Sequence, residues 1–402
     1  MQRPGVGLWQ APVVVVACGC LIAVLTFGPR TTIGLLLPPM NREMGWTRDI
    51  FAFAIAVQHI VWGIGQPFGG VVADRLGTVR ALCIGALLYS AGLFVMATAA
   101  TPAALFSAGA LVGFGLSGAS FNIVLAAFGK LLPETWRPLA TGVGGAAGSF
   151  GQFLFSPFCV LLLDAFDWRT TLLVFGTLVL LVLPLSLPLS TSRQIREQQE
   201  SVIPAQSVLQ VFRGALRTPS YVLLICGFLV SGSHVAFINL HLPAYLQDGG
   251  LDRPSAGWVI ATIGLFNIFG SIAIGWLCSR YPNRSVLFSI YFFRALAIAA
   301  FLLMPLSPLN ALLFAAAMGL LWTAPLTPVA GTITLMFGTR NLATLYGLAY
   351  LFHQIGAFFG VWAGGLVFEH TGSYNPVWWF LVIAALVTGF LTLLVREPRR
   401  AG

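Results

Sequence analysis

The chain has 402 residues, of which 58% are hydrophobic and only 8% are charged, and its formal net charge is +9. Soluble globular proteins contain about 25% charged residues, so this composition excludes a water-soluble domain and indicates a protein that crosses a membrane several times. The six cysteines lie within or beside apolar segments without metal-ligand spacing, which favours a packing role over a metal site.

Twelve segments are long and apolar enough to span a membrane as helices, for which about 20 residues are needed. The first runs from near Ala11 to about Pro38 and is too long for a signal peptide. The sequence therefore predicts an all-α membrane protein with twelve transmembrane helices at 12–38, 50–73, 79–99, 103–129, 138–163, 168–190, 219–246, 254–278, 285–305, 309–336, 342–368 and 375–395. Gly28-Pro29, Pro325 and Pro328 are expected to interrupt their helices.

The only long polar stretch, 191–218, predicts a cytoplasmic linker between an N-terminal six-helix half, 1–190, and a C-terminal six-helix half, 219–402. With both termini placed in the cytoplasm, 15 Lys and Arg residues fall on the cytoplasmic side and 4 on the other. This asymmetry predicts a multi-pass membrane protein with both termini in the cytoplasm, and we expect the membrane to be a bacterial inner membrane. It also accounts for the net charge, so the lipid bilayer is an expected partner and nucleic acid is not. We expect a monomer.

An internal repeat appears when the chain is shifted by 205 residues. Over two spans the halves align without a gap, and "RPLATG" (137–142) matches "RNLATLYG" (340–347). Six plus six spans in the same orientation predict two halves related by a pseudo-twofold axis along the membrane normal, which enclose a central site and rock around it.

The loop "GGVVADRLGTVR" (69–80) resembles the signature of the major facilitator superfamily. This resemblance covers the whole chain and implies the major facilitator fold, with a gating role for the cytoplasmic loops. Asp74 is available to cap a neighbouring helix and to pair with Arg. The residues assigned to gating are Gly70, Asp74, Arg75, Gly77 and Arg80, with Arg137, Arg280 and Arg340 in the related loops.

A narrower resemblance covers most of the chain. Segments such as "FGPRTTIGLLLPPMNREMGW" and "LYGLAYLFHQIGAFFGVWAGG" look like bacterial relatives of the monocarboxylate transporter family, which is similar to lactate carriers and oxalate/formate exchangers. Two features depart from that family. The eighth span, 254–278, has no charged residue, and the chain reads "LWQAPVVVV" where an acidic-Gly-aromatic signature opens the first span. The resemblance therefore implies the fold and not the substrate lactate.

Charged residues inside the spans are unequally distributed. All twelve acidic residues lie in loops or within about one turn of a span end, whereas Arg30 and Arg294 lie within spans. Intramembrane charges usually face a cavity on the transport path, and arginine binds carboxylates bidentately. We therefore expect Arg30 to bind a substrate carboxylate. The repeat aligns Arg30 with Val235, so His234 is expected at similar depth on the opposite wall as a second hydrogen-bonding group.

His241 shares a helical face with His234, and either histidine could carry a coupled proton; the alternative is a pair of packed, hydrogen-bonded side chains. Arg294 is assigned either to substrate contact or to a tie between span 9 and neighbouring backbone carbonyls. His59 and Gln66 are assigned to packing or to an outer gate. The further substrate-binding candidates are Asn122, Asn267, Trp322, Tyr346, Tyr350, His353 and Gln354.

These features predict a secondary active transporter that moves a small organic anion of the monocarboxylate type by alternating access, with proton symport or anion exchange. The alternative is a drug exporter of the same fold, although the span-5 Gly-Pro signature and a membrane-embedded acid are missing. The sequence has no Walker-type motif for ATP, no zinc motif and no catalytic cluster. We therefore expect no enzyme activity, no cofactor and no metal.

Overall fold

The protein is described by a computed structural model that places residues 11–191, 208–338 and 342–397, and every regular element in these ranges is helical. Proline at N1 or N2 begins several of the spans, because its missing N–H is not needed there. In chain order the helices are α1 (Pro12–Thr31), α2 (Ile33–Met44), α3 (Arg48–Leu76), α4 (Thr78–Thr98), α5 (Pro102–Gly118), α6 (Phe121–Leu131), α7 (Arg137–Ala165), α8 (Trp168–Leu180), α9 (Val182–Ser186), the 3-10 helix η2 (Leu187–Leu189), α11 (Val208–Leu216), α12 (Pro219–Asp248), α13 (Arg253–Arg280), α14 (Asn283–Leu303), α15 (Pro308–Leu320), α16 (Leu326–Phe337), α17 (Leu342–Thr371) and α18 (Asn375–Leu393).

The predicted spans are confirmed, and the structure shows which are interrupted. Within the described residues, eleven helical segments are long and apolar enough to cross a membrane, and the shorter apolar helices α15 and α16 occupy the tenth predicted span. The first span breaks at Thr32, just after the predicted Gly28-Pro29 interruption. There the Thr32 hydroxyl donates to the Pro29 carbonyl at 2.9 Å, so a side chain satisfies the freed backbone, as a break inside a membrane requires.

The 205-residue repeat extends through the helix boundaries. The first residues of the paired helices differ by 205 for α3 and α13, α4 and α14, α6 and α16, and α7 and α17. Both halves also break their fourth span, at 119–120 between α5 and α6 and at 321–325 between α15 and α16. The repeat thus describes the three-dimensional architecture and not only a few matching residues.

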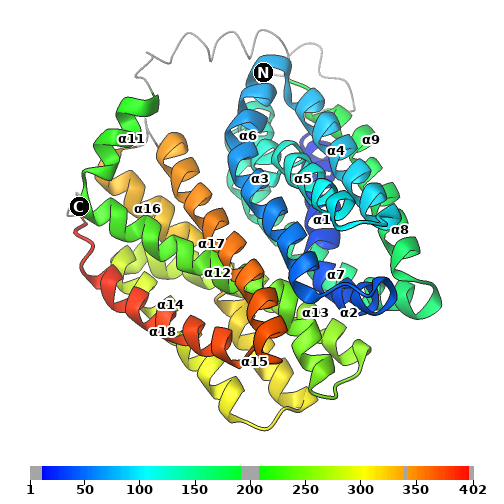
Figure 1. The fold of residues 1–402 in the computed structure, drawn as a ribbon. Coiled ribbons are helices and arrows are strands. Elements are labelled where there is room, and N and C mark those ends of the chain that lie inside the picture. Colours follow the sequence, from blue (N-terminus) through cyan, green and yellow to red (C-terminus); the bar gives the residue numbers. More distant parts are fainter. Residues whose placement is uncertain (1–10, 192–207, 339–341, 398–402) are drawn as a thin grey trace.

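Helices α1–α9 form one bundle and α12–α18 a second, and the two meet through α3 with α17, α7 with α13 and α2 with α12 (Figure 1). We call the end of the molecule at which α3 ends and α7 begins the linker end, and the opposite end the far end. Most of the predicted 191–218 linker lies outside the described residues, but its last part forms α11, a helix that its polar composition does not predict.

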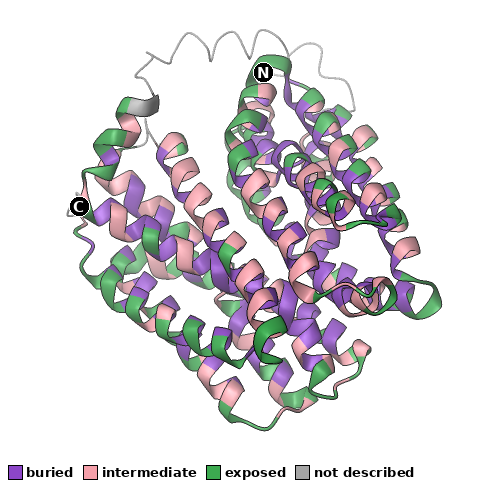
Figure 2. Cartoon of the chain, viewed as in Figure 1, coloured by how far each residue is buried: buried purple, intermediate pink, exposed green. Residues whose placement is uncertain are grey.

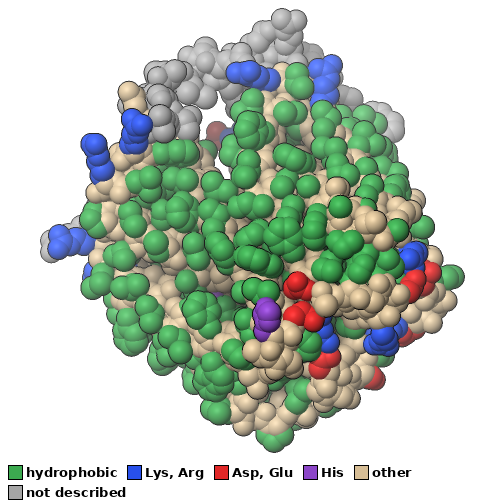
Figure 3. All heavy atoms as spheres, viewed as in Figure 1, with side chains coloured by type: hydrophobic (Ala, Val, Ile, Leu, Met, Phe, Trp, Pro, Cys, Tyr) green, Lys and Arg blue, Asp and Glu red, His purple; other side chains and the backbone are tan. Residues whose placement is uncertain are grey.

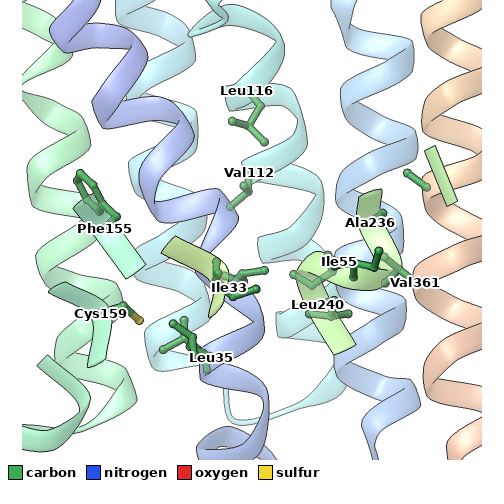
Figure 4. Packing of buried hydrophobic residues seen from close by; sticks show 14 of the residues in the cluster. Ile33, Leu35, Ile55, Val112, Leu116, Phe155, Cys159, Ala236, Leu240 and Val361 are labelled. Carbon is green, nitrogen blue, oxygen red and sulfur yellow. The ribbon is translucent and has the colours of Figure 1, made fainter. Parts of the chain in front are cut away.

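Buried residues lie between the helices and exposed ones on the outer surface (Figure 2). Figure 4 shows part of the interior, where Ala236 and Leu240 of α12 lie near Ile55 and Val361. Many exposed side chains are large and apolar, among them Leu161 and Phe380. Hydrophobic side chains cover most of the face in Figure 3, and the charged ones lie along its upper and left edges and in a group at the lower right. This is the surface of a protein surrounded by lipid.

Candidate functional site

A cavity of about 740 Å³ lies between the two bundles. It extends from mid-span residues such as Arg30 to Pro138 and Trp276 at the linker end, so it opens toward that end. Among the described residues that line it, Arg30 is the only lysine or arginine, and none is acidic. The cavity therefore carries one fixed positive charge without a fixed counter-charge.

Arg30 lies in the last turn of α1, two residues before the α1–α2 break at Thr32, in the wall formed by the N-terminal bundle. Its guanidinium carbon is 4.6 Å from the centroid of the Trp62 ring and 5.1 Å from that of Phe27. No ion pair or side-chain hydrogen bond of this guanidinium is found within residues 11–191, 208–338 and 342–397. The aromatic faces support the cation and leave its N–H groups available to a ligand.

An aromatic wall continues from Arg30 across to the C-terminal bundle. Trp62 meets Tyr350 edge-to-face with ring centroids 5.7 Å apart, and the ring of Tyr350 lies parallel to that of His353 at 5.5 Å. His353 in turn packs on Phe228 at 4.7 Å. These four residues line the cavity, so aromatic surface from both bundles surrounds the space next to the cation.

A second wall is polar but uncharged. Asn267 of α13 donates through Nδ2 to Ser149 Oγ at 2.9 Å, and its Oδ1 accepts from Thr323 Oγ1 at 2.8 Å and from Thr323 N at 3.2 Å. The hydroxyls of Ser271 and Thr323 are 3.1 Å apart. All four residues line the cavity, and we call them the polar wall. Asn267 therefore contacts the cavity as predicted and also joins the two bundles, because Ser149 belongs to α7.

Three further cavity residues keep a buried polar atom without a hydrogen-bond partner in the described part of the chain. These atoms are His59 Nδ1, Asn239 Oδ1 and Gln354 Nε2. The sequence predicts substrate contact for Gln354, but it assigns His59 to packing or an outer gate and does not single out Asn239 as a candidate. Unpaired buried polar groups are costly, so these atoms favour a ligand or water in the cavity.

His234 and His241, which the sequence predicts to face the cavity, do not line it. His234 is fully buried, with Nδ1 2.7 Å from the Val230 carbonyl and Nε2 3.1 Å from the Leu381 carbonyl. The reason is helical geometry. One residue turns a helix by about 100°, and the repeat partner of Arg30 is Val235, which does line the cavity together with Asn239 four residues later. The histidines therefore point toward α17 and α18.

Three other predicted contacts also lie away from the cavity. Arg294 is fully buried, and its guanidinium donates to the carbonyls of Leu321 and Trp322, as the structural alternative for this residue expects. Asn122 is exposed on α6, and Tyr346 packs near Phe228 without lining the cavity. Trp322 and His353, by contrast, line it as predicted.

At the far end, charged side chains connect the two bundles. Arg48 at the start of α3 forms a bidentate pair with Asp248 at the end of α12, at 2.6 and 2.8 Å. Its Nη1 also donates to the Tyr374 hydroxyl at 3.0 Å, and Tyr374 lies 3.2 Å from His241 Nδ1. The backbone N–H of Arg48 donates to the Glu369 carboxylate at 2.7 Å. His241 is thus part of a network that closes the far end and not of the substrate cavity.

A second inter-bundle pair lies across the same end. Arg253 at the start of α13 donates to Asp164 Oδ1 at 2.7 Å and to the Leu163 carbonyl at 3.1 Å. Arg253 is the repeat partner of Arg48, and Asp164 is the repeat partner of Glu369. We call Arg48–Asp248 and Arg253–Asp164 the far-end ion pairs. The predicted topology places both arginines among the four basic residues outside the cytoplasm and gives them no other role, although the 205-residue shift makes them equivalent positions.

The signature loop lies at the linker end, within the N-terminal bundle. Asp74 accepts from Lys130 Nζ at 2.9 Å instead of pairing with an arginine, and it does not cap the neighbouring helix α4. Gly77 has φ +98°, a conformation that favours glycine between α3 and α4. Arg80 donates to the Leu76 carbonyl at 3.5 Å and Arg137 to the Leu132 carbonyl at 3.1 Å.

The remaining gating candidates also lie near this end. The Arg280 guanidinium is 4.6 Å from the ring of Trp276, Arg75 is exposed, and a Cβ on Gly70 would meet open space. Arg340 lies outside the described residues. The hydrogen bonds of Asp74, Arg80 and Arg137 stay within the N-terminal bundle, which agrees with a cavity that opens here. The gating role of these loops stays a prediction.

Comparison with known proteins places this arrangement in a family. The sequence model of the Major Facilitator Superfamily matches residues 19–360 and 250–402. The chain is 26% identical over 371 residues to the uncharacterized MFS-type transporter YcxA of Bacillus subtilis, covering 90% of this chain and 88% of that protein. It is 24% identical over 368 residues to monocarboxylate transporter 12 of Mus musculus, covering 83% and 75%.

Solved structures with the same fold include transporters for different substrates. The crystal structure of nucleoside transporter NupG superimposes with a TM-score of 0.76 at 14% identity and covers 96% of this chain and 99% of that one. The D-xylose-proton symporter gives a TM-score of 0.74 at 16% identity, with 96% and 98% covered. At such identities the likeness shows the fold alone, so the substrate has to be argued from the cavity.

Proposed function

Because the chain belongs to the Major Facilitator Superfamily, a family of multi-pass membrane transporters and not of enzymes, we propose that it is a secondary carrier of small organic monoanions of the monocarboxylate class. The observation that carries the proposal is the Arg30 guanidinium, which faces the cavity without a carboxylate partner among the described residues. A substrate carboxylate supplies the missing counter-charge and accepts two parallel hydrogen bonds from the guanidinium.

The charge of the cavity supports a monoanion over a dianion. With Arg30 as the only cationic side chain in the described lining, one carboxylate neutralises the site, whereas a second would remain buried and unpaired, which is costly. A cationic drug has no acidic side chain to meet in this lining, so the exporter alternative is not favoured. The name of the mouse relative, monocarboxylate transporter 12, agrees with this assignment.

Transport in this proposal proceeds by alternating access around the cavity. The described conformation is closed at the far end by the far-end ion pairs and open at the linker end. We place the linker end in the cytoplasm of a bacterial inner membrane, following the distribution of Lys and Arg. Substrate at Arg30 lowers the charge in the cavity, which favours closure of the linker end around it and rupture of the far-end pairs.

Two coupling modes satisfy charge balance: proton symport and exchange for a second anion. His59 and His353 are the titratable imidazoles that line the cavity, so they are the side chains available to a proton. Purified protein in liposomes separates the modes. Symport requires uptake to respond to a pH gradient with an empty lumen, whereas exchange requires a trapped anion.

The experiment that tests the proposal measures uptake of radiolabelled acetate, butyrate and benzoate into liposomes that contain the wild type, Arg30→Gln or Arg30→Lys. Hydrogen bonds to charged groups contribute about 1.5–3 kcal/mol, roughly a 10- to 150-fold effect. Arg30→Gln should lose at least 10-fold of the saturable flux, and Arg30→Lys less. Arg213→Gln, the same change at an exposed position on α11, is the control. Unchanged flux in Arg30→Gln, or uptake of cations only, would remove the proposal.

A further inference from the structure

The polar wall contains no cation, so the charge of a carboxylate is balanced at Arg30 and not at this wall. Its members are Ser149, Asn267, Ser271 and Thr323, and all of them line the same cavity as Arg30. Hydroxyl groups both donate and accept, and Ser149 uses its oxygen to accept from Asn267. Such a cluster matches a neutral hydrogen-bonding substituent, such as a hydroxyl, better than a charge or an alkyl chain.

The position of this wall depends on an unwound segment. Residues 321–325, between α15 and α16, bring Trp322 and Thr323 to the cavity. The segment can come close to α13 because Gly270 has no side chain: a Cβ there would lie 2.1 Å from the Leu320 carbonyl oxygen. The carbonyls of Leu321 and Trp322, directly after α15, have no helical hydrogen-bond partners among the described residues and lie near the negative end of the α15 dipole.

Arg294 supplies those partners. Nε and Nη2 donate to the Leu321 carbonyl at 3.2 and 2.6 Å, and Nη2 also donates to the Trp322 carbonyl at 2.7 Å. Nη1 donates to Ser231 Oγ of α12 at 2.9 Å. Within residues 11–191, 208–338 and 342–397 this fully buried cation has no acidic partner. Its charge is satisfied by the unwound segment itself.

A continuous hydrogen-bond path then leads to the other bundle. Arg294 holds the carbonyls of residues 321 and 322, Thr323 donates twice to Asn267, and Asn267 donates to Ser149 of α7. The repeat-related position in the N-terminal bundle is Tyr89, whose hydroxyl donates to the carbonyl of Thr26, the repeat partner of Ser231, at 3.4 Å. An arginine therefore binds the unwound segment of the C-terminal bundle, and a tyrosine occupies the equivalent position in the N-terminal bundle.

We infer that the transported monoanion carries a neutral hydrogen-bonding group that docks on the polar wall, and that Arg294 is the positioning residue that sets this wall. The inference rests on the proposed carrier function. It assigns the carboxylate to Arg30 and the second group to Ser149, Asn267, Ser271 and Thr323, so substrate selection is divided between the two bundles.

The test compares the affinities of butyrate and its 2-, 3- and 4-hydroxy derivatives by calorimetry on the folded, purified full chain. In the wild type at least one hydroxy isomer should bind about 3- to 10-fold more tightly than butyrate, the effect of one neutral hydrogen bond. Arg294→Met and Thr323→Val should each bring that ratio to within about 2-fold while butyrate still binds. Combined, they should change the ratio no further, because they act on one path. Tyr89→Phe, the repeat-related control, should leave the ratio unchanged.

The possible results distinguish failure of the Arg294 role, of the polar-wall assignment and of the carrier proposal. A purely structural Arg294 would lower the thermal midpoint without changing the affinity ratio in the folded protein, and this result would overturn its positioning role. A wild type that binds all four acids equally would overturn the polar-wall assignment while the carrier proposal stands. Failure of every carboxylate, butyrate included, would instead remove the carrier proposal. If Arg294→Met does not fold, Arg294→Lys and Thr323→Val test the same ratio.

Discussion

The two bundles have equivalent helices, but the arginines inside their spans lie at positions that the repeat does not relate. Arg30 in the N-terminal bundle aligns with Val235 in the C-terminal one, and Arg294 in the C-terminal bundle aligns with Tyr89 in the N-terminal one. The two arginines also differ in environment. Arg30 faces the cavity on aromatic rings, whereas Arg294 is buried among carbonyls. The repeat thus determines the arrangement of the helices. Arg30 and Arg294, whose repeat partners are not basic, are the positions for which we propose specific functions.

Repeat-related glycines allow close helix crossings in both bundles, and the crossing is closer in the C-terminal bundle. A Cβ on Gly356 of α17 would lie 1.8 Å from the Leu229 carbonyl oxygen, and one on its repeat partner Gly151 would lie 2.7 Å from that of Val24. Overpacking costs about 1–3 kcal/mol and occasionally more. Gly356→Ala should therefore lower the free energy of unfolding by about 3 kcal/mol, and Gly151→Ala by about 1–2 kcal/mol.

The midpoint of thermal unfolding in detergent checks this order. At Gly142 and Gly347, another repeat-related pair, a Cβ would have no neighbouring atom within 4 Å, so Gly→Ala there should be neutral or slightly stabilising. Equal midpoints for Gly356→Ala and Gly151→Ala would show that the α12–α17 and α1–α7 crossings do not differ as the distances indicate.

The far-end ion pairs offer a symmetric comparison, because Arg48 and Arg253 are repeat partners in opposite bundles. Partly exposed ion pairs contribute up to about 1 kcal/mol each, so removing both should shift the closed-to-open equilibrium of the far end by about 1–2 kcal/mol, roughly 5- to 30-fold. Arg48→Ala should have the larger effect, since the Arg48 guanidinium also donates to the Tyr374 hydroxyl and lies 3.9 Å from the centroid of the Phe368 ring.

Spin labels at Phe166 and Thr371, repeat-related exposed positions at the far end, would report this opening as a longer distance population. Each single variant and the double variant should shift it, and Arg213→Ala should not. A distance distribution that stays at its wild-type value in the double variant would show that the ion pairs do not keep the far end closed.

The smallest predicted effect concerns the first turn of the sixth and twelfth spans. The Asp167 carboxylate accepts from the Thr170 N–H at 2.6 Å at the start of α8, whereas the equivalent cap of α18, Tyr374, has no side-chain hydrogen bond to the helix. Asp167→Ala should lower the free energy of unfolding by about 1 kcal/mol, and Asp167→Asn by less.

The same hydrogen bond gives this small contribution a pH dependence. It holds the pKa of Asp167 below its usual value, so the contribution is present above the unfolded-state pKa and is lost as the pH falls through the lowered folded-state value. Thermal midpoints of wild type and Asp167→Ala should therefore converge at acidic pH. A difference that persists there would contradict the cap as its cause.

The span pattern, the repeat and the exposure of Arg30 to a cavity could be predicted from the sequence, because hydropathy and the cost of charge in lipid act along the chain. Prediction failed where the rotation of a helix about its axis decides which side chains line the cavity. His234 and Val235 are neighbours in sequence, yet only Val235 lines the cavity. It also assigned His59 to packing or an outer gate and did not single out Thr323, because lining of the cavity depends on which helices meet and on where a helix unwinds.

The most direct test of the proposed pairing is a double-mutant cycle between the Arg30 guanidinium and the substrate carboxylate. Calorimetry would measure the affinities of benzoate and benzamide, which replaces the carboxylate with a neutral amide, for the wild type and Arg30→Gln. If the two groups pair, the wild type prefers benzoate by at least 10-fold and Arg30→Gln loses that preference. The same preference in both proteins would show that Arg30 does not recognise the carboxylate, and would contradict the proposed function.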